Sequence, residues 1–303
     1  MNPPTASAMS NISIVTPSYW ADHDLVERLA QSMDRHFKFA FNHFIVISRR
    51  DRHLFAKMAG PHRRIIFAED ILRPFGFRRI PLPRRIRLPL FGERRYREQW
   101  HLPGAGRVGG WTVQQIIKIA AADFTRAETI VFADSDIEII RDVTADRFVR
   151  DGRVLLHEHS DVANNPRSAT WRRHALHVLG LPQSADRGFS YVGNLIAWDR
   201  QTLIDIRRKI SANGSSWWLQ LAKIKDVSEY MIYGTYVKNL ENDQRHIVGN
   251  HDLYYSIWDE ANLGRNDALK DTHVAVHLQS VLPIGDGKRK EIIAAIKCKL
   301  EVL

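Results

Sequence analysis

Two aspartates, Asp134 and Asp136, stand one residue apart in the apolar stretch TIVFADSDIEII, residues 129–140. Ile, Val and Phe predict a buried strand here, and a carboxylate is costly to bury unless another group pairs with it. Ligands of parallel sheets bind beyond the carboxyl ends of the strands, where we expect this pair to lie. Two carboxylates at this spacing can share Mg²⁺ or Mn²⁺, which prefer oxygen ligands and commonly bridge to substrate phosphates. The pair therefore predicts a divalent metal that holds a diphosphate.

Two other interpretations of the aspartate pair remain open. Asp also accepts hydrogen bonds in loops after strands without any metal. In phosphatases of the haloacid dehalogenase type, an Asp-X-Asp motif follows an apolar strand, and its first Asp is the nucleophile. That motif normally lies near the start of its domain, whereas 133 residues precede Asp134. Its position in the chain disfavours the phosphatase.

The elements that must position this pair alternate between strands and helices. Apolar and β-branched runs predict strands over 12–19, 43–48, 63–68, 129–140, 153–159, 189–198 and 273–280. Helical spacing of apolar residues predicts helices over 22–37, 51–58, 111–124, 169–179, 200–211, 228–240 and 288–300. Such alternation predicts a single α/β domain, with a mostly parallel sheet flanked by helices.

The chain divides into a flexible N-terminal tail (1–11), a domain (12–285) and a basic C-terminal helix (286–303). Residues 73–107 form an insertion rich in Arg and Pro, around Arg84, Arg85 and Arg87. It could clamp a diphosphate through its guanidinium groups. It could instead dock on anionic lipid, or be a solvated basic loop. The lipid interpretation places four aromatic residues in the membrane interface, namely Phe75, Phe77, Phe91 and Trp100. The C-terminal helix would suit the same lipid surface, or it could pack on the domain.

Composition limits the partners and the compartment. The 303 residues are 44% hydrophobic and carry a net charge of +10, which suggests an anionic partner: nucleic acid, a membrane surface or a phosphorylated substrate. The single cysteine, Cys298, excludes an intrachain disulfide and fits a reducing compartment. The first residues do not resemble a signal peptide, and no apolar run reaches the ~18 residues of a membrane span. We therefore expect a cytoplasmic protein, which could also sit on the inner face of the cytoplasmic membrane.

Several motifs in order along the chain resemble those of GT-A glycosyltransferases, and in particular a bacterial GT-A-type family formerly of unknown function. An apolar strand followed by Asp-X-Asp resembles the DXD motif, which in that superfamily binds a metal chelated by a nucleotide-sugar diphosphate. Four further segments match in order, namely IVTPSY, GWTVQQIIKIAAA, YVGNLIAW and SEYMIYGTYV. The resemblance covers residues 12–280 and implies a GT-A-like, Rossmann-type sheet.

The resemblance also implies roles for individual residues. The loop after the first strand, with Thr16, Pro17 and Tyr19, would carry the nucleotide, and an aromatic side chain can stack on a base. Gly193 and Asn194 would border the sugar, although a strand bulge with a buried amide explains them nearly as well. Each residue of the loop also fits a role as ordinary connecting structure.

A late histidine often supplies the third metal ligand in GT-A enzymes, in addition to the aspartate pair. His277 is nearer the predicted strand end than His273, so His277 is the candidate, with a structural histidine as the alternative. Gln115 and Lys118 lie three residues apart on one face of the helix before the DXD strand, where Lys118 could touch a phosphate or be solvated.

Glu229 is the candidate catalytic base. Ser228 could cap the helix over 228–240, which would place Glu229 in its first turn. A carboxylate there could deprotonate an acceptor hydroxyl, or simply interact with the helix dipole.

These assignments predict a hexosyltransferase that moves a sugar from a UDP- or GDP-sugar to a hydroxyl of a cell-envelope glycan or lipid-linked acceptor. Bound Mn²⁺ or Mg²⁺ would stabilise the departing diphosphate. The rival from another class is a non-catalytic protein that binds nucleic acid through its Arg stretch. That rival has no recognisable nucleic-acid motif and leaves the aspartate pair unexplained, so we expect no nucleic-acid partner.

Overall fold

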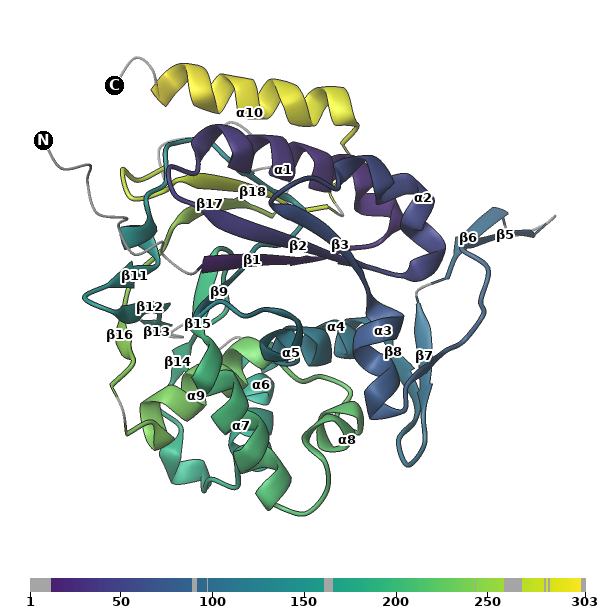
Figure 1. Cartoon of the computed structure of the whole chain (residues 1–303), viewed down its shortest axis with the longest axis vertical. Coiled ribbons are helices and arrows are strands. Elements are labelled where there is room, and N and C mark those ends of the chain that lie inside the picture. The colour runs from purple at the N-terminus through teal and green to yellow at the C-terminus, as the bar shows by residue number, and fades with distance from the viewer. Residues whose placement is uncertain are drawn as a thin grey trace, which may run out of the picture.

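A sheet of five strands forms the centre of the molecule, and four of its strands are parallel (Figure 1). The strand order is β15-β9-β1-β2-β3, with β15 antiparallel to β9 at one edge. The strands are β1 Ile12–Pro17, β2 Phe41–Ile47, β3 Arg63–Phe67, β9 Thr129–Phe132 and β15 Ile196–Asp199. Every residue of β1 and β9 is buried, as expected for strands covered on both faces. The predicted α/β fold class is confirmed.

The structure is a computed structural model that describes residues 12–88, 92–96, 98–160, 166–242, 244–258, 269–280, 282 and 284–300. The predicted N-terminal tail lies outside these residues, as does Phe91 of the insertion. Among the residues described, none of the helices combines the length and apolar character that crossing a bilayer requires.

The strands that follow β1 in the chain are placed first on one side of it and then on the other. Strands β2 and β3 follow β1 to one side, whereas β9 pairs with its other side. The carboxyl ends of β1 and β9 therefore border a topological switch point, where α/β sheets bind ligands. The loops after Pro17 and Phe132 both begin at this point.

Helices cover both faces of the central sheet (Figure 1). On one face, α1 (His23–His36) buries Val26, Leu29, Ala30 and Met33, whose spacing makes one apolar stripe. On the other face, Val15 of β1 packs in one cluster with side chains of four helices, over residues 110–119, 166–179, 200–212 and 229–240. The helices after α1 are α2 Arg52–Phe55, α3 Ala68–Leu72, α4 Gly110–Ile119, α5 Ala121–Phe124, α6 Pro166–Leu179, α7 Arg200–Ala212, α8 Trp217–Ala222 and α9 Glu229–Leu240.

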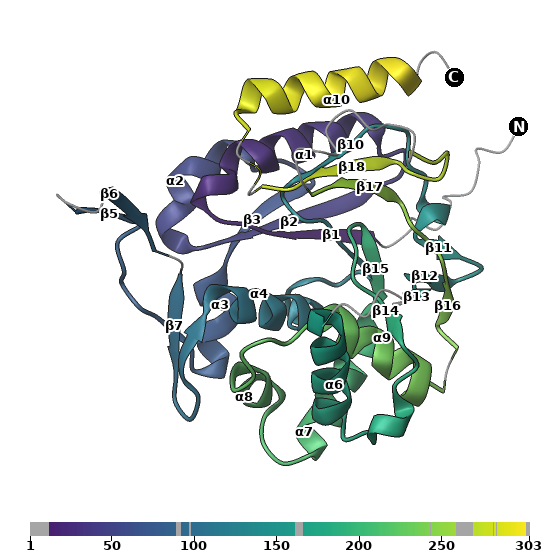
Figure 2. The same ribbon diagram turned by 180° about the vertical axis from the view of Figure 1, so that it is seen from behind.

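A second sheet and the C-terminal helix lie on the α1 side. The sheet has the order β10-β18-β17, formed by β10 Ile137–Ile139, β17 Tyr254–Ile257 and β18 Ala275–Leu278. Helix α10 (Asp286–Leu300) lies over α1 and this sheet (Figure 2). The prediction of one strand over 129–140 is therefore wrong, because β9 and β10 belong to different sheets. Asp134 and Asp136 lie in the turn that passes between them.

The predicted strand over 189–198 is also divided. Only β14 (Phe189–Ser190) and β15 are strands, and the segment between them contains Leu195 with a φ of +54°. A left-handed backbone is uncommon for leucine and breaks an extended run. Four further small strands are β11 Val149–Arg150, β12 Arg153–His157, β13 His159–Ser160 and β16 His246–Gly249.

The Arg/Pro-rich insertion forms antiparallel strands. A hairpin of β5 (Arg85–Leu88) and β6 (Gly92–Arg95) extends from the body in Figure 1, and β4, β7 and β8 form a three-stranded sheet. The last three are β4 Arg78–Arg79, β7 Gln99–Leu102 and β8 Gly106–Gly109. Phe77 and Trp100 are buried in the core, and Phe75 stacks on Trp218. Their predicted insertion into lipid is wrong for Phe77 and Trp100, because the domain itself covers these rings.

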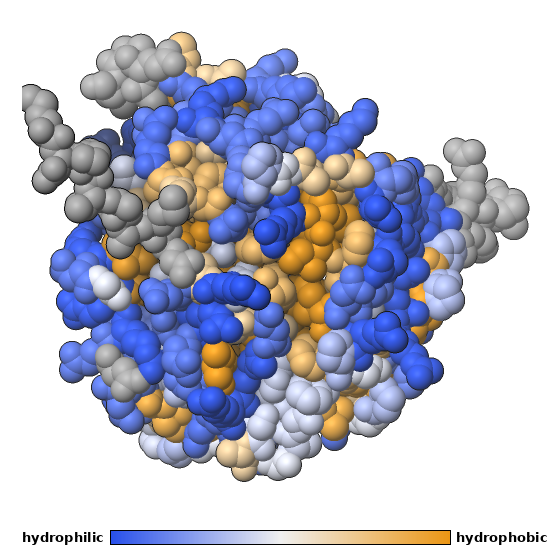
Figure 3. Space-filling model, viewed as in Figure 1, coloured by the Kyte–Doolittle hydropathy of each residue, from blue (hydrophilic) through white to orange (hydrophobic). Residues whose placement is uncertain are grey.

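Hydrophilic side chains cover most of the face shown in Figure 3, and apolar side chains gather between the upper and lower helices, over β2 and β3. Strand β3 is an edge of the central sheet, where Ile65, Ile66 and Phe67 are half-buried. Arg63 and Arg64 precede them, and charged residues on an edge strand discourage pairing with another chain.

Candidate functional site

Asp134 is held by residues from two other parts of the chain. Its backbone N–H donates to Asn194 Oδ1 at 3.3 Å, and its Oδ1 accepts from Lys118 Nζ at 3.2 Å. Lys118 comes from α4 and Asn194 from the segment before β15. The structure thus brings three residues that the sequence predicted separately into direct contact. Asn194 finds the partner that a buried amide requires.

Lys118 is buried, with 3% of its side chain exposed, and is not a solvated lysine. Its Nζ lies 3.0 Å from Glu229 Oε1 and donates to the Tyr230 hydroxyl at 2.8 Å. Burial alone would lower the pKa of Lys118, but Asp134, Glu229 and Tyr230 together hold this pKa well above its usual value. Lys118 is therefore a charged ammonium that joins Asp134 to Glu229.

Glu229 lies beneath Lys118, with 1% of its side chain exposed. Ser228 caps α9, as predicted, because its side chain accepts from the Met231 N–H. Burial raises the pKa of Glu229 more than the charge of Lys118 lowers it. Within the described part of the chain, Glu229 Oε1 has this ion pair but no partner with hydrogen-bond geometry. The raised pKa suits a general base, whereas the burial closes Glu229 to solvent, so its catalytic role stays a prediction.

Asp136 pairs with the predicted histidine. Its Oδ2 lies 3.3 Å from His277 Nε2 and accepts from the Ser280 N–H at 2.9 Å. Burial would raise the pKa of Asp136, but His277 and the Ser280 N–H outweigh it and hold this pKa below its usual value. Ser256 Oγ contacts His277 Nδ1 at 2.7 Å, which fixes the orientation of the imidazole ring.

Across the ranges that the structure describes, no three His, Cys, Asp or Glu side chains form a group that could hold a metal ion. Asp136 and His277 are together, but Asp134 is engaged by Lys118. A carboxylate and an imidazole are ligands that Mn²⁺ accepts, and such sites are commonly completed by substrate phosphates. The donor pair therefore fits a metal that reaches the protein with a diphosphate, and the three-ligand assignment stays a prediction.

The predicted nucleotide loop exposes only one of its three residues. Thr16 is buried and its hydroxyl contacts His43 Nε2 at 3.0 Å, while Pro17 is buried at the end of β1. Tyr19 is 48% exposed and can offer its ring to a ligand. Gln115 is buried too, and its amide donates to the Trp111 carbonyl within α4. Thr16 and Gln115 thus have partners within the protein, and their roles in nucleotide binding stay predictions.

Gly193 allows close packing beside the site. A Cβ atom at this position would lie 2.8 Å from Ile196 Cδ1 and 3.4 Å from Tyr254 Cε1. The Tyr254 ring lies edge-on to His277, with 6.2 Å between ring centroids. Gly193 therefore lets the segment that carries Asn194 approach the second sheet, where the predicted metal ligands lie.

Sequence reasoning missed several residues at this site. Asp22 Oδ2 accepts from the Ser135 hydroxyl at 2.9 Å, and burial raises the pKa of Asp22 to about 6, with the Asp136 carboxylate adding to the effect. Ser18 Oγ is buried without a hydrogen-bond partner in the described chain. Trp258 is 60% exposed, and its ring lies 5.3 Å from that of His277. No predicted strand directly precedes Trp258, and Ser18 falls inside the predicted strand 12–19, so no sequence signal pointed to either residue.

The base of the arginine hairpin is fixed beside the loop that follows β1. Arg84 pairs with Asp51, and Asp51 Oδ2 accepts from the Trp20 N–H at 3.1 Å. The guanidinium groups of Arg84 and Arg85 lie 5.7 and 4.8 Å from the centre of the Trp20 ring. Arg84 therefore joins the hairpin to the predicted nucleotide loop.

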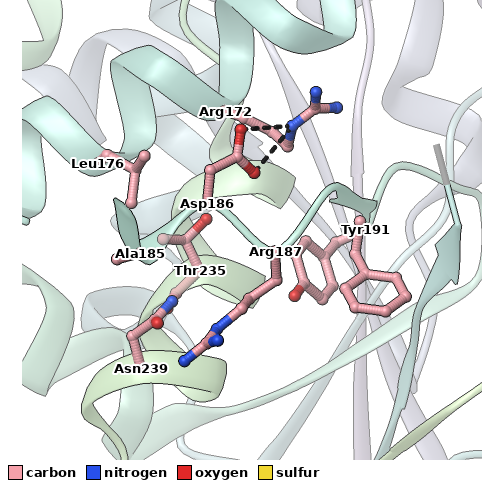
Figure 4. A pocket seen from close by; sticks show the side chains of 9 residues that line it. Arg172, Leu176, Ala185, Asp186, Arg187, Tyr191, Thr235 and Asn239 are labelled. Atoms are coloured by element: carbon pink, nitrogen blue, oxygen red, sulfur yellow. Dashed lines mark hydrogen bonds and ion pairs between the residues drawn. The ribbon is translucent and has the colours of Figure 1, made fainter. Parts of the chain in front are cut away.

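A small pocket between α6 and α9 contains none of the predicted site residues. Figure 4 shows the ion pair between Arg172 and Asp186, with Nε–Oδ1 at 3.0 Å, on one side of it and Tyr191 on the other. Burial raises the pKa of Tyr191, whose hydroxyl donates to Glu158. We assign no ligand to this pocket.

The fold and the site define an α/β protein with a charged cluster at the switch point of a mostly parallel sheet. The chain belongs to a family of unknown function, DUF6492, whose model matches residues 9–274. No curated protein matches the chain.

Proposed function

We propose that this protein is a metal-dependent glycosyltransferase that uses a nucleotide sugar. The observation that carries the proposal is the position of Asp134 and Asp136 at the carboxyl end of β9, beside the switch point, with Lys118, Asn194 and His277 in contact with them. The resemblance to GT-A enzymes supplies the reaction class. The donor is a UDP- or GDP-sugar.

Asp136 and His277 would hold Mn²⁺ or Mg²⁺, together with oxygens of the donor diphosphate. When bound, the cation neutralises charge on the departing diphosphate and orients it. The proposal is supported by the lowered pKa of Asp136, which keeps this carboxylate ionised and able to bind a cation. Ser256 orients the imidazole of His277 from its other nitrogen.

Lys118 would act electrostatically at the same place. Its ammonium faces Asp134 and Glu229 at once, so the two carboxylates exceed its charge. This excess negative charge favours a cation at the site. Lys118 also fixes the orientation of Asp134, and the 2.8 Å hydrogen bond to Tyr230 fixes Lys118 in turn.

Donor and acceptor would approach from the exposed side of the cluster. Tyr19 offers a ring for the base, and Gly193 and Asn194 border the sugar. Glu229 is the proposed base for the acceptor hydroxyl, with a pKa raised by burial. The acceptor is a cell-envelope glycan or lipid-linked precursor, and the net charge of +10 suits peripheral contact with an anionic membrane from the cytoplasm.

Isothermal titration calorimetry with UDP and GDP, in the presence of Mn²⁺ or of a chelator, tests the proposal. We expect binding that requires Mn²⁺ and that Asp136→Asn abolishes. The matched control is Asp252→Asn, because Asp252 Oδ2 and His273 Nε2 form a second Asp–His pair, also 3.3 Å apart, outside the proposed site. This control variant should bind like the wild type.

Metal-independent binding, or equal losses in both variants, would overturn the metal assignment. A steeply salt-dependent affinity for nucleic acid, without nucleotide binding, would favour the non-catalytic alternative instead. Assays of glycosyl transfer with the donor that binds best would then identify the sugar.

A further inference from the structure

The C-terminal helix α10 is attached to the domain at both of its ends. Ile293 and Ile296 are buried in a cluster with the second sheet. Asp286 in its first turn pairs with Arg28 of α1, and Lys297 Nζ lies 2.6 Å from Glu138 Oε1 of β10. These contacts favour packing on the domain over docking on lipid for this face of the helix.

Arg289 is a buried cation of this helix. It is 7% exposed, whereas its neighbours Lys288 and Lys290 are exposed. Its guanidinium donates to backbone carbonyls of the segment before the helix: Nη1 to Leu278 at 2.8 Å, and Nη2 to Gln279, Ser280 and Leu282 at 2.8, 3.3 and 3.4 Å. A rigid, planar group with five donors can hold several carbonyls at once, which an ammonium cannot do in the same way.

The segment that Arg289 holds is the one that contacts Asp136. The Ser280 N–H donates to Asp136 Oδ2 at 2.9 Å, and the Leu278 N–H donates to the Asp136 carbonyl at 3.0 Å. A pocket between α1, α10 and the second sheet is lined by both Arg289 and Asp136. Arg289, residues 278–280 and Asp136 thus form a continuous chain of contacts.

We propose that Arg289 is a positioning residue that sets the orientation of the Asp136 carboxylate through the Ser280 N–H. The inference rests on the proposed function in one respect, namely that Asp136 binds a divalent cation. It makes α10 part of the site, although residues 275–303 lie beyond the range that the family model matches. A fixed outer partner typically contributes about 10- to 100-fold to metal affinity.

The variants Arg289→Met and Lys297→Met test the positioning role of Arg289. Both variants remove one cation of α10, but Lys297 contacts Glu138 and not the segment before the helix. The Mn²⁺ concentration for half-maximal nucleoside-diphosphate binding should rise about tenfold or more in Arg289→Met, and stay near the wild-type value in Lys297→Met. Arg289→Lys keeps the positive charge but lacks the planar guanidinium, so it should behave like Arg289→Met. It also provides a milder variant if Arg289→Met does not fold.

Hydrogen exchange at the Ser280 amide gives a readout that needs no metal and no ligand. The amide should exchange faster in both Arg289 variants than in the wild type and in Lys297→Met. If folded Arg289→Lys shows the wild-type exchange rate at Ser280 and the wild-type Mn²⁺ dependence, a positive charge alone is enough to position Asp136. The proposed role of the guanidinium hydrogen bonds would then be wrong. If the wild type needs no metal for nucleotide binding, the proposed function fails, and the exchange measurement still decides whether Arg289 fixes Ser280.

Discussion

Two buried cations, Lys118 and Arg63, have different kinds of partners in the protein. Arg63 on β3 donates from Nε to His43 Nδ1 at 3.0 Å, from Nη2 to Asp34 at 2.7 Å and to the Ala30 carbonyl at 3.2 Å. Lys118 contacts two carboxylates and a hydroxyl, and its ammonium lies 3.0 Å from Oε1 of the buried Glu229.

The difference indicates different purposes. The Arg63 cluster joins α1, β2 and β3 and satisfies its polar groups, as a structural network should. The Lys118 cluster lies at the switch point, where α/β sheets bind ligands, and its Asp134 side chain is 35% exposed. Perturbed pKa values occur in both clusters, so only position in the fold separates the functional candidate from the structural one.

The largest expected effect follows from Glu229→Gln. If Glu229 is the general base, kcat for glycosyl transfer should fall about 10²- to 10⁴-fold, while donor affinity stays close to the wild type. Glu241→Gln is the matched control, because Glu241 is a second buried carboxylate, at the other end of α9, paired with His246. Normal turnover would place the base elsewhere. A parallel loss of donor affinity would make Glu229 a residue that positions Lys118.

Lys118→Met should reduce kcat/KM about 10²- to 10³-fold, because it removes a fixed positive charge from the site. Its cost in stability should be small, since Glu229 already has a raised pKa and can take up a proton when Lys118 is absent. Urea unfolding and steady-state kinetics on the same preparation measure both effects. A stability loss as large as that of Arg63→Met would show that the Lys118 cluster is structural.

Arg63→Met should lower the free energy of unfolding by about 3 kcal/mol. This is at the lower end of the loss for a broken buried ion pair, because the Asp34 carboxylate is half exposed and water can solvate it. Nucleotide binding per folded molecule should not change. If the folded variant loses Mn²⁺-dependent affinity for the nucleotide, the Arg63 cluster is not purely structural, and the distinction from the Lys118 cluster fails.

The sequence predicted those parts of the site that short, local patterns define. The apolar run before Asp134, the spacing of Lys118 on its helix and the Ser228 cap are local, and the structure contains each of them. It also brings Asp136 and His277 together, which the resemblance alone implied.

Features that depend on distant partners were not predictable. The run over 129–140 contains no Gly or Pro, and β10 separates from β9 because it pairs with β18, far along the chain. Thr16 reads as a loop residue beside Pro17, yet its hydroxyl meets His43 on β2. Arg84 could be assigned to phosphate, lipid or solvent from the sequence, and in the structure it pairs with Asp51. Strand register and contacts between distant segments fix these features, and no local spacing encodes them.

The smallest effect concerns the pH dependence of the Arg63 cluster. Burial, with Arg63 and His62 adding to it and Asp34 opposing it, lowers the pKa of His43 to about 3, from 6.5 for a free side chain. The unfolded chain therefore takes up a proton below pH 6.5 that the folded protein does not. The contribution of His43 to stability therefore falls as the pH drops from 6.5 towards 3, by about 2 kcal/mol at pH 5.

The variant His43→Gln isolates the contribution of His43 to the pH dependence of stability, because a glutamine side chain can also hydrogen-bond Arg63 and Thr16 but does not titrate. Urea unfolding of both proteins at pH 8, 6.5 and 5 should show a difference in stability that narrows only below pH 6.5. Other perturbed groups, such as Asp22 with its raised pKa, titrate in both proteins and cancel in the difference. A constant difference from pH 8 to pH 5 would mean that folded His43 accepts a proton. The Arg63 cluster would then tolerate a second charge, and its interpretation as a closed structural network would be wrong.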